Sequence, residues 1–367
     1  MKKADYYSGT KILSMRDING NKPEIYMVVS NRSGGKTTFY GRMLVNRFKK
    51  KGEQFVLLYR YKYELDDVKT KFFNDIGKLF FNKDSMTQKT ILKDSIIELL
   101  LNKKTCGYAV CLNSADAVKK YSHIFSEVTS ILFDEFQSET SNYCNNELRK
   151  FHSIHTSIAR GQGKQSRYVP VYMLSNPVTI INPYYVAFGI HTRIDSKTKY
   201  LKGDGFVLER IVIESAKKAQ EESSFNRAFG DSEYNRYSTS GEELLDNYSF
   251  IVPNINTKSR PSYIATLKYN DNNYSIKEYK NEGIVYVDDN YDESFPRRIS
   301  VTNSDHEINY IMLRTNDVFI STMRDYYSLG VVRFKNLMCQ ECFLQLVAIR
   351  LWLVYNISVF NNVLYIL

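Results

Sequence analysis

The stretch Ser30-Asn-Arg-Ser-Gly-Gly-Lys-Thr-Thr38 decides how this chain folds. It follows the apolar run 25–29, which predicts a buried strand, and it precedes residues 39–50, which contain no proline and predict a helix. A strand, a glycine-bearing loop, Gly-Lys-Thr and a helix are the context of a phosphate-binding loop. The alternative is a chance glycine turn before a helix. The flanking pattern and a second motif favour the phosphate-binding loop.

The chemistry of such a loop requires these residue types. Loop amides and the helix N-terminus point at phosphate oxygens, and glycines let the backbone approach closely. Lys36 would reach the β- and γ-phosphates of ATP, and the Thr37 hydroxyl would bind Mg²⁺. Ser30 stands where the usual motif has its first glycine. The remaining nucleotide contacts are expected from Arg32, Ser33, Gly34, Gly35 and Thr38.

A second motif is the apolar strand 131–133 followed by Asp134 and Glu135, 98 residues after the loop lysine. Asp134 at the strand tip would hold Mg²⁺ through water, and Glu135 would polarise the attacking water. An acid pair after apolar residues is common, but together with the loop it indicates an ATPase of the additional-strand, catalytic-glutamate type. A third apolar strand, 169–174, ends at Ser175 and Asn176, which could touch the γ-phosphate. The alternative is a strand-terminating Asn-Pro turn.

Strand and helix patterns alternate from about residue 20 to 195 and predict a mostly parallel α/β sheet with strands at 25–29, 55–60, 108–112, 129–133 and 170–174. We expect a P-loop ATPase domain over 1–200 and a linker subdomain over 201–247. Residues 248–367 should form a smaller α+β domain, because 263–268, 274–279 and 284–287 alternate with turns as an antiparallel meander does. The apolar stretch 343–367 is interrupted by polar residues, which indicates a buried closing element or a subunit contact rather than a membrane span.

Charge is distributed unevenly. The net charge is +10. Residues 1–200 carry 32 Lys and Arg against 18 Asp and Glu, residues 201–247 carry 6 against 10, and residues 248–367 carry 12 against 12. A basic excess confined to the ATPase part is what a binder of phosphate backbones would have. A generically basic protein is the alternative. Residues 1–20 lack the apolar core of a secretory signal, so we expect a protein that is not secreted.

The three motifs, in this order and spacing, resemble the DNA-packaging ATPases of phi-29-like short-tailed bacteriophages, relatives of terminase large subunits. The likeness is good over about 20–195. It is carried by the segments 52–55, 60–65, 133–136, 174–176 and 182–184. The resemblance implies a motor that hydrolyses ATP, with Mg²⁺, to push double-stranded DNA into a preformed viral shell. It implies a homo-oligomeric ring, a pentamer in the family, acting at the portal vertex of the procapsid in the host cytoplasm. The portal would be a partner, and a packaging RNA is a further candidate.

The resemblance also implies an arginine that acts on a neighbouring subunit's ATP. Arg160 lies where this family places it, and Arg167 is the reserve. Arg32, inside the loop, could instead act within its own subunit, and Lys119 and Lys120 occupy a position similar to that of an interface lysine. The alternative is that Arg160 and Arg167 contact DNA or solvent.

The resemblance further implies an RNase H-like second domain without nuclease function. A two-metal nuclease needs about three clustered carboxylates, and residues 261–267 contain none. Asp288, Asp289, Asp292 and Asp317 lie in turn-like contexts. Two other enzymes remain open, namely a terminase with a working nuclease and another P-loop nucleic-acid translocase. The non-enzymatic rival is an assembly factor that binds ATP as a switch, but such a factor has no need of Glu135.

Overall fold

The computed structural model describes residues 6–66, 74–93, 95–140, 142–161, 163–191, 193–194, 197–230, 232–244, 246, 248, 250–313 and 317–347. The chain divides into two compact units, Met1–Leu245 and Asp246–Leu367. Each is described by itself.

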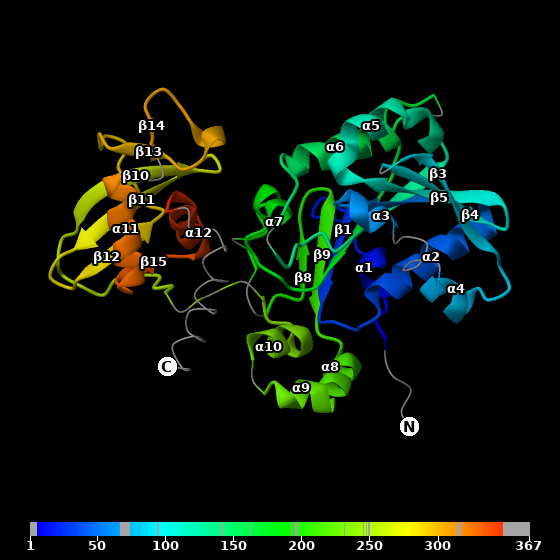
Figure 1. Cartoon of the computed structure of the whole chain (residues 1–367), viewed down its shortest axis with the longest axis horizontal. Coiled ribbons are helices and arrows are strands. Elements are labelled where there is room, and N and C mark those ends of the chain that lie inside the picture. The colour runs from blue at the N-terminus through cyan, green and yellow to red at the C-terminus, as the bar shows by residue number, and fades with distance from the viewer. Residues whose placement is uncertain are drawn as a thin grey trace, which may run out of the picture. The chain divides into compact units, whose positions relative to one another are not determined.

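A mixed sheet organises the first unit (Figure 1). Within the described residues it has nine strands, in the spatial order β3 (Met86–Leu92), β4 (Ile96–Leu101), β5 (Lys104–Cys111), β2 (Gln54–Tyr59), β6 (Val128–Asp134), β7 (Val171–Ser175), β1 (Ile25–Ser30), β9 (Phe206–Ile211) and β8 (Tyr200–Lys202). The six strands from β5 to β9 are parallel, and β3, β4 and β8 add antiparallel edges. The mostly parallel α/β sheet is confirmed, and its five predicted strands are all present.

Both faces of this sheet are covered, because successive side chains of a strand point to opposite faces. Along β1, Met27 and Val29 enter one apolar cluster while Tyr26 and Val28 enter the other. The first cluster includes side chains of α5 (Ala115–Lys120), α6 (Glu147–Ile158) and α7 (Pro183–Ala187). The second includes side chains of α1 (Thr10–Ser14), α2 (Lys36–Lys51), α3 (Lys62–Asp66) and α4 (Asn74–Phe80).

The segment 201–247 differs from its prediction as a separate linker. Its β9 pairs with β1 over six residues, so it completes the central sheet and belongs to the first unit. The short helices α8 (Glu214–Glu221), α9 (Ser224–Ala228) and α10 (Glu233–Ser240) follow as a cluster of their own (Figure 1). The composition suggested a linker because β9 has only six residues, and the polar and acidic residues around it dominate the segment.

The second unit contains a smaller sheet in the order β14 (Ile311–Met312), β13 (Arg298–Ser300), β10 (Ser262–Tyr269), β11 (Asn272–Tyr279), β12 (Ile284–Asp288) and β15 (Val332–Phe334). Strands β10, β11 and β12 form the predicted antiparallel meander. The helices are α11 (Val318–Ser328) and α12 (Leu337–Leu346). Phe343 and Val347 of the apolar C-terminal stretch are buried, and its residues 348–367 lie outside the described residues.

Candidate nucleotide site

The predicted phosphate-binding loop leaves the carboxyl end of β1 and enters α2. Ser33 and Gly35 have left-handed φ angles of 62° and 89°, which fold the backbone around the start of the helix. Gly34 packs against the helical cluster, since a Cβ built there would lie 2.8 Å from Cγ1 of Ile213. Arg32 and Thr38 flank this turn. The loop therefore requires glycine at 34 for space and at 35 for conformation.

Lys36 points back across this loop and is only 7% exposed. Its Nζ donates to the Ser30 carbonyl at 2.9 Å and to Ser30 Oγ at 3.0 Å. It also donates to Oδ1 of Asn176, beyond the end of β7, at 3.2 Å. Ser30, the departure from the usual motif, thus supplies the lysine with a hydroxyl acceptor. Burial lowers the pKa of Lys36 to about 8, although Asp134 opposes that shift.

Thr37 and Asp134 meet at the carboxyl edge of the sheet. The Thr37 hydroxyl donates to Oδ2 of Asp134 at 2.7 Å. Desolvation raises the pKa of Asp134, while the hydrogen bond from Thr37 and the charge of Lys36 oppose that rise. A hydroxyl and a carboxylate, beside a second carboxylate, are the oxygen ligands that Mg²⁺ prefers. These residues fit the predicted metal.

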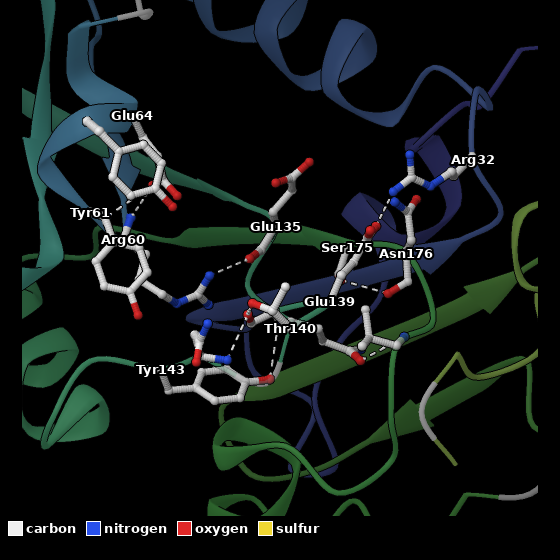
Figure 2. A pocket seen from close by; sticks show the side chains of 15 residues that line it. Arg32, Arg60, Tyr61, Glu64, Glu135, Glu139, Thr140, Tyr143, Ser175 and Asn176 are labelled. Carbon is white, nitrogen blue, oxygen red and sulfur yellow. Dashed lines mark hydrogen bonds and ion pairs between the residues drawn. The ribbon is translucent and has the colours of Figure 1, made fainter. Parts of the chain in front are cut away.

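Glu135 follows directly and has a left-handed φ of 55°. Desolvation and the neighbouring Asp134 carboxylate both raise its pKa. Its carbonyl accepts a hydrogen bond from Arg60 Nη1 at 3.1 Å, and in Figure 2 its side chain points away from that guanidinium. A left-handed φ is uncommon outside glycine, so neighbouring contacts must hold this backbone.

Arg60 supplies those contacts. Its Nε bonds both carboxylate oxygens of Glu147 at 3.0 and 3.1 Å, and its Nη2 donates to the Phe136 carbonyl at 2.7 Å. Glu147 also accepts from the Tyr184 hydroxyl at 2.8 Å. The two charged side chains are 6% and 2% exposed. Sequence reasoning gave neither residue a role, because Glu147 lies at the start of a helix, where acids are common.

Two further polar residues bind the strand ends together. The Gln137 side-chain oxygen accepts from the backbone N–H groups of Val178 and Thr179, at 3.1 and 3.0 Å, so the segments that follow β6 and β7 are joined. Buried Ser175 donates to the Asn176 carbonyl at 2.7 Å. Of the predicted pair, Asn176 reaches Lys36, while Ser175 fixes the backbone next to it.

A cavity of about 470 Å³ opens beside these groups (Figure 2). Its lining includes Glu135, Ser175 and Asn176 from the strand tips, together with Arg32, Arg60, Tyr61, Glu64 and Glu139. Arg32 forms an ion pair with Glu139, whose carboxylate also accepts from the Tyr237 hydroxyl of α10. In this structure Arg32 is therefore tied to the helical cluster. Sequence reasoning missed Glu139, four residues beyond Glu135, which has no motif signal of its own.

The other candidate cations lie elsewhere. Arg167 is half-buried and donates to the backbone carbonyls of Val128 at 3.0 Å and Ile158 at 2.7 Å. Arg160 is exposed, and its side chain has no bonding partner among the residues that the structure describes. Lys119 and Lys120 are exposed at the end of α5. Through Arg167, the loop that carries Arg160 lies beside Val128, which begins β6. Asp134 ends the same strand, so the loop lies about 20 Å from the end of β6 at which Thr37 and Asp134 meet.

The four aspartates considered above as nuclease ligands are each engaged in other contacts. Asp288 pairs with Lys277 at 2.9 Å and with Lys335 at 3.2 Å. Lys335 also pairs with Asp289. Asp292 accepts from Ser294 at 2.7 Å, and Asp317 caps α11. No group of three or more His, Cys, Asp or Glu side chains that could hold a metal occurs within the described ranges of the chain.

Comparisons with known proteins identify relatives of this chain. The chain is 25% identical over 341 residues to a DNA packaging protein of Bacillus phage PZA, covering 92% of this chain and 95% of that protein. Identity and coverage are the same for a DNA packaging protein of Bacillus phage phi29. The bacteriophage Phi-29 viral genome packaging motor assembly matches in structure, with a TM-score of 0.65 at 23% identity, over 96% of this chain and 99% of that chain.

Within the described residues, no helix is both long and apolar enough to span a bilayer. The family model of the podovirus DNA encapsidation protein (Gp16) matches residues 1–350. This match covers nearly the whole sequence, and the chain therefore belongs to the family of podovirus DNA encapsidation proteins.

Proposed function

We propose that this chain is the ATP-hydrolysing subunit of a motor that moves double-stranded viral DNA into a preformed procapsid. The single observation that carries the proposal is the meeting of Lys36, Thr37 and Asp134 at one sheet edge, in a family whose members package DNA. The position of β7 between β1 and β6 supports the additional-strand class of P-loop ATPase.

The chemistry follows from the contacts. Lys36 binds the β- and γ-phosphates of ATP, and Thr37 and Asp134 hold Mg²⁺. When bound, Mg²⁺ neutralises the charge that develops on the transferred phosphoryl group. Glu135 accepts the proton of the attacking water, and its raised pKa makes it a better base than an ordinary glutamate. Arg60 fixes the backbone of Glu135 and so sets where the carboxylate points.

Asn176 offers a way to report hydrolysis. Its Oδ1 accepts from Lys36, so the contact that Lys36 makes with the γ-phosphate competes with its bond to Asn176. Loss of the γ-phosphate would restore that bond. The strand-end contacts of Gln137 would carry the change to the segment after β7.

Assembly follows from the placement of the cations. Arg160 and the nucleotide site lie at opposite edges of one sheet, so Arg160 can serve only the ATP of another copy. Repeated head-to-tail contacts form a ring when the rotation between neighbouring copies closes. We propose a homo-oligomeric ring, pentameric as the resemblance implies, at the portal vertex in the host cytoplasm. Its partners would be double-stranded DNA and the portal, with a packaging RNA as a further candidate.

For the second unit we propose an RNase H-like domain without nuclease activity. Its meander supports the fold, and the pairing of Asp288 and Asp289 with lysines leaves these acids poorly suited to hold two metals. Manganese-dependent nicking of plasmid DNA by the whole chain would instead favour a terminase with a working nuclease.

The test combines the chain, Mg²⁺, ATP, duplex DNA and a cognate procapsid. We expect DNA to become resistant to added nuclease only when ATP is present, and Lys36→Ala to abolish that protection. Binding of ATP without turnover, under conditions where the chain assembles on procapsids, would favour the assembly-factor alternative.

A further inference from the structure

Lysines from three segments gather at the amino edge of the first sheet. They are Lys49 and Lys50 at the end of α2, Lys83 after α4, and Lys103 and Lys104 at the turn between β4 and β5. All five are exposed. We name them the hairpin-tip surface. This surface lies near the start of β2 and β5, whereas the phosphate-binding loop follows the end of β1. The two sites therefore lie at opposite ends of the parallel strands.

One carboxylate organises this surface. Asp84 pairs with Lys49 and accepts from Nδ2 of Asn102 at 2.8 Å. Oδ1 of Asn102 in turn accepts from the Ser85 N–H at 2.8 Å. The hydrogen bond from Lys49 holds the pKa of Asp84 below its ordinary value. The Asp84 carboxylate is therefore already paired, and its contacts hold the three segments together.

The turn that carries Lys103 is strained. Asn102 and Lys103 have left-handed φ angles of 52° and 66°, as a two-residue hairpin requires. Asparagine and glycine are the residues that tolerate this conformation best, and a lysine there is uncommon. Strain of this kind is retained where the surrounding structure or a function compensates for it. The turn thus places two adjacent, exposed lysines at the tip of the hairpin between β4 and β5.

The remaining cations of the surface are uncompensated. Within the part of the chain that the structure describes, Lys50, Lys83, Lys103 and Lys104 have no ion-pair partner. The nearby Glu53 pairs with Lys51 instead, and Glu98 accepts from Thr105. Four like charges on a rigid surface repel one another, and a polyanion relieves that repulsion.

We propose that the hairpin-tip surface binds the phosphodiester backbone of a double-stranded nucleic acid. The inference rests on the proposed function, which supplies such ligands, and it names where the first unit holds one. Lysine ammonium groups contact phosphates without reading bases, so binding is independent of sequence. Since Lys49 and Lys50 lie in the last turn of α2, whereas Lys36 begins that helix, the surface is remote from the ATP site and acts as an anchor that does not require nucleotide.

The experiment measures how the binding constant depends on salt, without ATP, for the full chain. Each lysine–phosphate contact contributes roughly −0.9 to the slope of log K against log salt concentration. Lys103→Ala with Lys104→Ala should therefore flatten the slope by about 2 units. The matched control is Lys217→Ala with Lys218→Ala, which removes the same charge from α8 among acidic neighbours and should leave the slope unchanged.

Duplex DNA and duplex RNA of equal length are titrated separately, and the one whose slope flattens is the ligand of the surface. Lys50→Gln with Lys83→Gln removes two charges from the other two segments without altering the turn, and it should flatten the slope equally. This second pair keeps the proposal testable if substitutions in the turn disturb folding. Parental slopes with both pairs of substitutions, for both nucleic acids, would overturn the proposal.

Basal ATP hydrolysis separates this inference from the proposed function. The lysine variants should hydrolyse ATP at the parental rate, because their positions are remote from Lys36 and Asp134. A chain that shows the slope change but no turnover in any form would keep the nucleic-acid surface and refute the motor.

Discussion

The hydroxyl of Thr37 and the carboxylate of Asp134 share a 2.7 Å hydrogen bond although the residues stand 97 positions apart in the chain. They meet because β1 and β6 both run parallel to β7, which lies between them, so their carboxyl ends reach the same edge of the sheet. This contact brings two magnesium-type oxygen ligands within reach of one ion.

The two adjacent acids should separate binding from hydrolysis. Glu135→Gln is expected to bind ATP with parental affinity and to hydrolyse it about 10²–10⁴-fold more slowly, because an amide cannot accept the proton of water. Asp134→Asn should also weaken the dependence of binding on Mg²⁺. Equilibrium nucleotide binding and phosphate release measure the two effects. Parental hydrolysis by the glutamine variant would exclude Glu135 as the base.

ATP binding should weaken as pH rises through about 8, the pKa to which burial lowers Lys36. Below that pH the ammonium is present in the free protein, and phosphates stabilise it further, so the pKa of Lys36 rises on binding. Between pH 7.5 and 9 the affinity should therefore fall roughly tenfold. Lys36→Arg keeps its charge throughout this range and serves as the control. If the arginine variant binds ATP and loses affinity equally, another group titrates.

The buried pair of Arg60 and Glu147 should matter for both stability and activity. Arg60→Ala leaves the Glu147 carboxylate buried without its partner, which costs about 3–5 kcal/mol in unfolding free energy. It also frees the Glu135 carbonyl, so ATP turnover should fall in the fraction that stays folded. Denaturant unfolding of Arg60→Ala, Glu147→Ala and the double variant measures the coupling. If the two single effects simply add, the pair does not act as a unit.

The cluster of Lys36, Thr37 and Asp134 could be predicted from the sequence because each residue belongs to a short local motif. Lys36 and Thr37 lie beside glycines whose function is conformational, and Asp134 follows an apolar run that must form a strand. The supporting residues could not be found in this way. Glu147 and Glu139 act through contacts that only the tertiary structure creates, and nothing in their local sequence differs from that of an ordinary surface acid.

The prediction of the central sheet from the sequence had a similar limit. The predicted strands contain the continuous apolar runs 25–29 and 131–133, as expected of parallel strands buried on both faces. β9 contains Glu209 and Arg210 and lies among polar residues, so the pattern did not distinguish it from a linker. Glu209 is buried there because it accepts from the hydroxyl groups of Tyr7 and Tyr200, a long-range arrangement that periodicity does not reveal.

The last prediction concerns which arginine crosses to a neighbouring subunit. Arg160 and Arg167 flank one loop, but their environments differ. Arg167 donates to the carbonyls of Val128 and Ile158, so Arg167→Ala should lower the melting temperature. Arg160 is exposed, and Arg160→Ala should leave the melting temperature unchanged while it removes the stimulation of ATP hydrolysis that accompanies assembly. An arginine supplied in this way can contribute roughly 10³–10⁵ in rate.

Mixing variants distinguishes a role in trans from one in cis. An Arg160→Ala subunit has a complete pocket, and a Glu135→Gln subunit has a working arginine. In a mixed ring the second can place its guanidinium at the pocket of the first, so turnover should return in part although each variant alone is inactive. The control is a mixture of Arg160→Ala with Arg160→Ala/Glu135→Gln, which assembles alike but contains no donor. If the first mixture is as inactive as the control when both have co-assembled, Arg160 does not act across the interface, and Arg32 at the pocket becomes the stronger candidate.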